Sequence, residues 1–85
     1  MIRVRCLGHI GTSLGTGEVR IDKADLEAGE IVDMLRSMVK TGETGFNRFN
    51  TLAMIEDGEA FVPAGSGRRV KEGETLVLIP FSHGG

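Results

Sequence analysis

The chain has 85 residues, which is enough for one domain, and its 40% hydrophobic and 26% charged residues are ordinary for a globular protein. A net charge of −2 argues against a general nucleic-acid-binding protein, and a single cysteine excludes an internal disulfide and any four-cysteine metal site. No apolar run approaches the ~20 residues of a membrane span, so we expect a cytoplasmic protein without a signal region or a membrane partner.

The first 22 residues predict two strands. Residues 2–7 alternate between apolar and charged side chains, which is typical of a half-buried strand with Ile2, Val4 and Cys6 on the inner face. Residues 8–17 contain four glycines and are expected to form a loop. This loop lacks the lysine of a phosphate-binding loop and precedes a strand, so we reject phosphate binding there. Residues 18–22 alternate again and complete a predicted hairpin.

The period then changes to that of a helix. Between residues 30 and 40, five apolar residues recur at helical spacing and predict one buried face: Ile31, Met34, Leu35, Met38 and Val39. Glu30 lies in the first turn and Lys40 at the end, as the helix dipole favours. Gly42 is expected to cap the helix in a left-handed conformation.

The second half of the chain predicts three further strands. Residues 41–50 form a polar connection, and its Phe46 and Phe49 are expected to pack onto the core. A strand at 51–56, a turn at Asp57-Gly58 and a short strand at 59–62 follow. Residues 75–79 are almost continuously apolar, which indicates a central strand beside the first one, and Pro80 should end it.

This order of elements predicts a two-layer α+β domain. We interpret it as a β-grasp, or ubiquitin-like, fold: a mixed sheet of four to five strands with one main helix on one face. Residues 1–80 would form the domain, and residues 81–85 a flexible C-terminal tail that ends in Gly-Gly.

The last 13 residues carry a more specific likeness. Residues 73–85, which run from a Gly-Glu turn through an apolar strand to a free Gly-Gly, resemble the C-terminus of the MoaD/ThiS family of sulfur carriers. Residues 55–63 also resemble a hairpin of that family. The small subunit of molybdopterin synthase usually has two prolines before its tail, whereas this chain has only Pro80, followed by Phe81.

The resemblance implies a carrier protein that is not itself an enzyme and binds no cofactor. In the family, an E1-like enzyme uses ATP to adenylate the terminal carboxylate, here that of Gly85, and sulfur from a persulfide then replaces AMP to give a thiocarboxylate. Gly84 has no Cβ and would allow close approach to the reacting phosphate. Pro80 favours molybdopterin synthesis, with the large synthase subunit as sulfur acceptor.

Other functions stay open at this stage. Thiamine synthesis and tRNA thiolation use the same activated glycine. A protein modifier would instead transfer that glycine to a lysine, and a simple interaction module would have an inert tail. Conjugates that resist thiols and hydroxylamine would favour the modifier.

A carrier also needs a docking surface for its activating enzyme. If Leu76 and Leu78 point toward the helix, alternation places the residues between and after them on the opposite face of the sheet. We expect the partner surface to comprise Val77, Ile79, Phe81, Phe61, Arg69 and His83. We expect no functional role for the single cysteine and no metal-binding role for the two histidines. Cys6 is expected to be a small core residue rather than a sulfur relay, and His9 and His83 are not expected to bind a metal.

Overall fold

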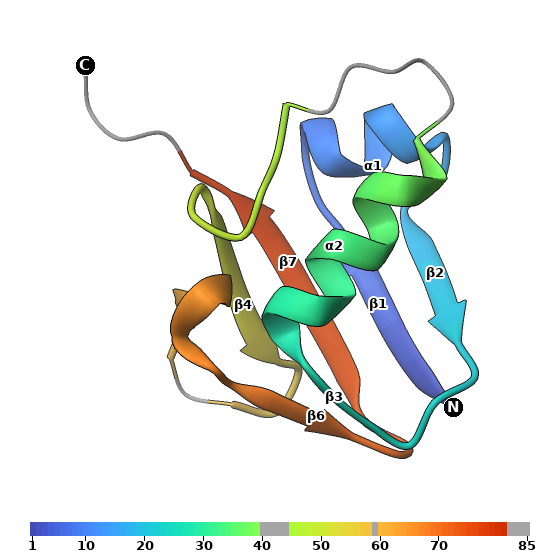
Figure 1. Cartoon of the computed structure of the whole chain (residues 1–85), viewed down its shortest axis with the longest axis vertical. Helices are drawn as coiled ribbons and strands as arrows, with labels where there is room; N and C mark the ends of the chain where they lie inside the picture. The colour runs from blue at the N-terminus through green and yellow to red at the C-terminus, as the bar shows by residue number, and fades with distance from the viewer. Residues whose placement is uncertain (40–44, 59, 82–85) are drawn as a thin grey trace.

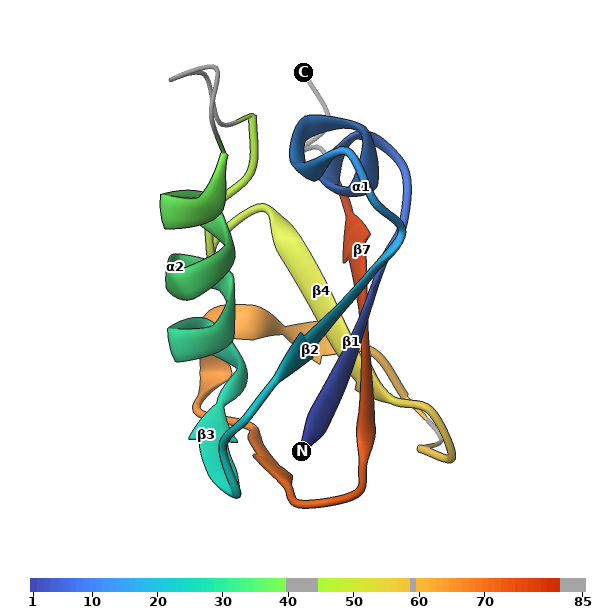
Figure 2. The same cartoon turned by 90° about the vertical axis from the view of Figure 1, so that its right-hand side faces the viewer.

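The computed structural model describes residues 1–39, 45–58 and 60–81. It contains a five-stranded mixed sheet in the order β2-β1-β7-β4-β5, with the helix α2 across one face (Figures 1 and 2). The five strands are β1 (Ile2–Cys6), β2 (Glu18–Ile21), β4 (Thr51–Ile55), β5 (Val62–Pro63) and β7 (Thr75–Pro80). The predicted sheet with one main helix is thus confirmed.

Strand β7 lies at the centre of the sheet, as its apolar sequence predicted. It runs parallel to β1, with Val4 beside Leu76, and antiparallel to β4, with Leu52 beside Ile79. Pro80 is the last residue of the strand. Because both edges of β7 are paired, the whole sheet depends on this one segment.

Helix α2 (Ala28–Met38) begins and ends two residues earlier than the sequence suggested. Glu27 and Glu30 form a capping box at its start, in which the backbone N–H of Glu27 donates to Glu30 Oε1 at 3.0 Å. Ile31 and Leu35 are buried as predicted, but Met38 is 48% exposed and is not a core residue. Val39 already has an extended conformation, so the helix ends before the predicted cap. Gly42 lies outside the described residues.

Residues 9–14 form a short helix, α1 (His9–Leu14), so the prediction of a loop there is wrong. Ile10 is fully buried and anchors the helix to the core. The glycines assist this packing, because a Cβ on Gly11 would lie only 2.7 Å from the carbonyl oxygen of Cys6. Gly15 caps the helix with φ of 77°, and its N–H donates to the Gly11 carbonyl at 2.9 Å.

A second, two-stranded sheet pairs β3 (Asp25–Glu27) with β6 (Arg69–Lys71) and was not predicted. Its inward side chains are Leu26 and Val70, which lie opposite each other, and Val70 is fully buried. A 3₁₀ turn, η1 (Ala64–Ser66), precedes β6. Figure 1 shows β3 running directly into the start of α2.

The remaining expectations concern the segment between α2 and β5. Phe46 is fully buried, as predicted, whereas Phe49 is 71% exposed and does not pack into the core. The turn after β4 is confirmed, since the N–H of Gly58 donates to the carbonyl of Ile55 at 2.6 Å. The short strand lies at Val62–Pro63 rather than at 59–62. It is an edge strand, where a proline is tolerated.

Candidate functional site

The two faces of β7 differ in what covers them. Leu76 and Leu78 are fully buried and belong to the core beneath α2, which confirms the predicted alternation. Val77 and Ile79 point to the opposite face of the sheet, and Figure 2 shows no helix on that side. We call this side the open face.

An apolar patch crosses the open face from β7 to β4. In the antiparallel register, Ile79 lies beside Leu52 and Val77 beside Met54. Leu52, Met54 and Ile79 are half-buried, and Val77 is 6% exposed. These four residues form what we call the open-face patch. Val77 and Ile79 were predicted from the sequence, whereas Leu52 and Met54 were not, although both alternate with buried residues along β4.

Charged side chains border this patch on the side of β1. Arg5 lies beside Val77 in the parallel register, and its Nη1 atom is 3.2 Å from Oε1 of Glu56. Glu56 follows β4 on the far side of β7, so the arginine side chain reaches across the central strand. This explains the low exposure of Val77 on a face that no helix covers. Further along β1, Arg3 lies directly opposite Arg20 of β2.

The chain leaves the sheet at the end of the open-face patch. The N–H of Phe81 donates to the carbonyl of Asn50 at 2.9 Å, and the Phe81 side chain is half-buried. Asn50 is held in turn by Asn47, because the side-chain oxygen of each accepts the backbone N–H of the other, at 2.7 and 3.1 Å. The exit point of the tail is therefore fixed by the loop before β4.

Pro80 is fixed from the other side, by Gly8. A Cβ on Gly8 would lie 3.0 Å from Cγ of Pro80, and the φ of Gly8 is +57°, so only glycine fits this contact comfortably. The predicted site residues His83, Gly84 and Gly85 lie outside the described residues.

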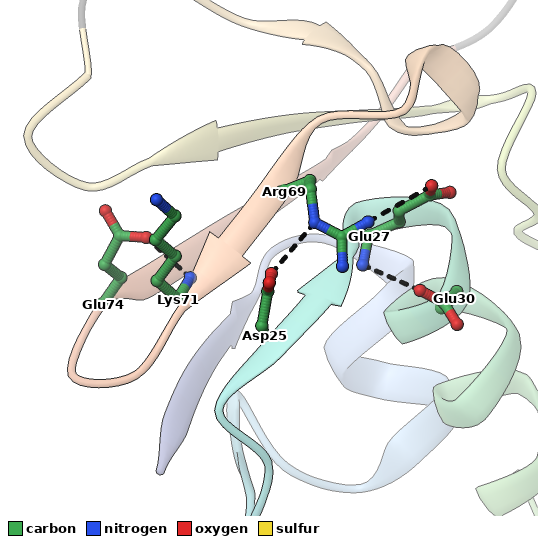
Figure 3. A network of polar contacts seen from close by, with 6 residues as sticks. All are labelled: Asp25, Glu27, Glu30, Arg69, Lys71 and Glu74. Carbon is green, nitrogen blue, oxygen red and sulfur yellow. Dashed lines mark hydrogen bonds and ion pairs between the residues drawn. The ribbon is translucent and has the colours of Figure 1, made fainter.

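Arg69 takes part in a different arrangement. Its Nε atom is 3.0 Å from Oδ1 of Asp25, and its Nη1 atom is 3.4 Å from Oε1 of Glu27 (Figure 3). The hydrogen bond and charge of Asp25 raise the pKa of Arg69 above its ordinary value. The guanidinium thus joins β6 to β3, including Glu27, which is the N-cap of α2. The structure does not bring Arg69 together with the open-face patch, and its docking role stays a prediction.

Phe61 immediately precedes β5 and is 43% exposed. It is one of the few large apolar side chains on the surface of the described part of the chain. Exposure is compatible with the predicted contact to a partner, which stays a prediction.

The thiol of Cys6 is buried in the core, as predicted. Burial raises its pKa from 9.0 to about 11, so the nucleophilic thiolate is scarce at neutral pH.

Among the described residues, no three His, Cys, Asp or Glu side chains are grouped so that they could hold a metal ion. No helix in the described part of the chain is long and apolar enough to cross a membrane.

The strand order, the mixed sheet and the single helix laid across it define a ubiquitin-like β-grasp protein. Two crystal structures of small archaeal modifier protein 1 (SAMP1) of Haloferax volcanii share this fold. One has a TM-score of 0.66 and 20% sequence identity over 99% of this chain and 98% of that chain. The other has a TM-score of 0.65 and 18% identity over 95% and 97%. No family model matches the sequence, and no curated protein matches it.

Proposed function

We propose that this chain is a ubiquitin-like sulfur carrier whose C-terminal Gly85 carboxylate is activated by an E1-like enzyme. The observation that carries the proposal is the path of β7. This strand occupies the centre of the sheet, ends at Pro80 beside the open-face patch, and leads into a sequence that ends in Gly84-Gly85. A rigid domain therefore precedes a short tail without bulky terminal side chains.

The proposed chemistry has three steps. The Gly85 carboxylate attacks the α-phosphate of ATP, so that pyrophosphate leaves and an acyl-adenylate forms. A persulfide sulfur then attacks the acyl carbon, AMP leaves, and reduction of the remaining S–S bond by a thiol gives the thiocarboxylate. The partner enzyme supplies ATP binding and catalysis, while this chain supplies the acyl group and binds no cofactor of its own.

The open-face patch would dock the activating enzyme. It is apolar at its centre and is bordered by the Arg5–Glu56 ion pair, so it suits a partner with an apolar surface. Phe81 lies where the tail begins and would contact the partner at the entrance to its active site. Phe61 and His83 complete the proposed contact set.

Within sulfur transfer, we assign the chain to molybdopterin synthesis, with a large synthase subunit as acceptor. The sequence feature that favours this pathway is Pro80, the single proline before the tail. Thiamine synthesis and tRNA thiolation are alternative destinations for the same thiocarboxylate. Activity would reside in cytoplasmic complexes without nucleic acid or membrane binding by this chain.

A second candidate function is protein modification. It is favoured by the names of the similar structures, both of which are small archaeal modifier protein 1. In that role the adenylated Gly85 would form an isopeptide bond with a lysine of a target protein. Activation is common to both functions, and only the acceptor differs.

The test combines the protein with an E1-like enzyme, ATP and a persulfide donor, followed by mass spectrometry of the C-terminal peptide. The carrier predicts exchange of oxygen for sulfur at Gly85 and no such product from a chain that lacks Gly85. Oxidation of Cys6 or of the four methionines adds nearly the same mass, so the change must be localised to the last peptide.

Two variants sharpen this test. Ile79→Glu should lose adenylation while keeping its fold, and Lys71→Glu, a charge change on β6, should keep both. Covalent adducts in which Gly85 is joined to a lysine, with no thiocarboxylate on the unconjugated chain, would favour the modifier. An unreactive Gly85 with every E1-like enzyme tried would contradict both functions and leave an interaction module.

A further inference from the structure

Strand β2 forms one edge of the five-stranded sheet, and half of its backbone groups point away from the sheet. The N–H of Cys6 donates to the carbonyl of Gly17 at 2.8 Å, so Gly17 faces β1. In an antiparallel pair the direction alternates, and Val19 and Ile21 therefore face β1 while Glu18 and Arg20 face outward. Figure 2 shows β2 in front of the sheet, with no other strand beyond it.

The contacts of Thr16 support this direction independently. Its hydroxyl accepts from the N–H of Glu18 at 3.3 Å and donates to the carbonyl of Glu18 at 3.1 Å. Both backbone groups of Glu18 therefore point away from β1, toward a side chain that occupies the place of a neighbouring strand. Among the described residues, no strand takes that place at Arg20.

The two edges of the sheet are built differently. Strand β5 is only two residues long and contains Pro63, which blunts an edge against further pairing. Strand β2 has four residues, without proline or lysine. It is therefore the edge that can accept another strand.

We propose that β2 pairs antiparallel with β2 of a second copy of this chain, about a two-fold axis at Val19. Residues that lie directly opposite each other in a sheet have their side chains on the same face. The allowed registers therefore place residues that face outward opposite residues that face outward, and residues that face β1 opposite residues that face β1. With Val19 opposite Val19 of the second copy, Glu18 lies opposite Arg20 twice. Each of these two pairs is of the hydrogen-bonded kind, because Glu18 and Arg20 both direct their N–H and C=O outward.

The charges of the facing side chains favour this register over the two nearest allowed registers. A shift in one direction places Arg20 opposite Arg20 and Glu18 opposite Asp22, which brings like charges together in each case. A shift in the other direction places Glu18 opposite Glu18. Of these three registers, only the proposed one forms opposite-charge pairs. The Glu18–Arg20 pair within each of the two copies, at 3.5 Å, is exchanged for two pairs between copies.

The dimer would have two-fold symmetry and a small interface. Thr16 must release Glu18 before the second strand can bind, which weakens association further. Pairing along β2 continues the sheet across both copies. It leaves β7, the open-face patch and the start of the tail uncovered, because these lie on the face and at the centre of the sheet rather than at its edge. The proposal does not depend on what is attached to Gly85.

Sedimentation velocity from about 10 µM to about 1 mM protein tests the proposal, since small interfaces associate weakly. We expect a concentration-dependent dimer. Arg20→Glu and Glu18→Arg should each weaken it about tenfold or more, because like charges then face each other. The double variant Glu18→Arg/Arg20→Glu should restore it. Lys71→Glu carries the same charge change as Arg20→Glu on another strand and should leave association unchanged.

Thr16→Val gives a test with the opposite sign. It removes the hydroxyl that competes for Glu18 and should tighten the dimer about three- to tenfold. Hydrogen exchange at the Glu18 and Arg20 amides should slow as protein concentration rises. A chain that stays monomeric at about 1 mM in both the unmodified and the Thr16→Val forms, or a dimer that neither single charge reversal weakens, overturns the proposal.

Discussion

Replacing Leu78 by alanine should destabilise the domain far more than the same change at the next residue, Ile79. Leu78 is fully buried at the centre of the sheet beneath α2, whereas Ile79 is half-buried on the open face. A buried Leu→Ala change costs about 2–5 kcal/mol, and full burial in a central strand places Leu78 near the middle of that range, at about 3 kcal/mol. Ile79→Ala removes a side chain that water already reaches, and we expect it to cost about 1 kcal/mol.

These magnitudes are large on the scale of the whole domain. At about 0.05–0.15 kcal/mol per residue, the total free energy of unfolding is roughly 4–13 kcal/mol. Leu78→Ala should therefore lower the melting temperature by roughly 12–24 °C, and Ile79→Ala by less than about 8 °C. Urea unfolding followed by circular dichroism measures both free energies. If Ile79→Ala costs as much as Leu78→Ala, the assignment of the two faces of β7 is wrong.

Two further predictions concern α1 and the buried thiol. Gly11→Ala should cost about 1–3 kcal/mol of unfolding free energy, since the new Cβ would meet the Cys6 carbonyl at 2.7 Å; Gly17→Ala, where a Cβ meets nothing within 4 Å, is the matched control and should cost little. Raising the pH from 9.0 to about 11 should lower stability, because the unfolded chain loses the Cys6 proton in this range while the folded chain retains it. Cys6→Val should reduce that loss in urea titrations at each pH, and an identical pH profile for the variant would contradict the assigned origin.

Periodicity predicted the main elements because each of them has one buried face of sufficient length. The alternation of residues 2–7 and 18–22 and the helical spacing after Glu30 come directly from the need to place apolar side chains on one side. Met38 was misplaced because it is the last residue of α2, where its side chain is 48% exposed although it fits the apolar pattern. Periodicity alone does not show where a helix ends.

The missed elements are short and are stabilised by contacts distant in sequence. Helix α1 was taken for a loop because of its glycines, although Ile10 and Leu14 already have the spacing of one helical face. The β3–β6 sheet has only one inward side chain on each strand, too few to produce a pattern. Its stability comes from pairing and from the ion pairs of Arg69, which local sequence does not reveal.

The candidate site was predictable in part for the same reason. Alternation along β7 identified Val77 and Ile79 as facing away from the helix. Leu52 and Met54 join them only through the register between β4 and β7, which depends on how the two strands align. Arg69 was included in the expected partner surface, whereas its acidic partners lie more than 40 residues earlier in the chain and are not revealed by local sequence.

The central place of β7 also orders events during synthesis. Strands β1 and β4 have no contact with each other in the sheet until residues 75–80 have been inserted between them. A nascent chain that stops before Thr75 therefore cannot close its sheet, and pairing of β1 with β7 must await synthesis of residues 75–80. A product truncated before Thr75 would expose unpaired strands to proteases instead of forming a closed sheet. The topology thereby makes closure of the sheet depend on synthesis of residues 75–80.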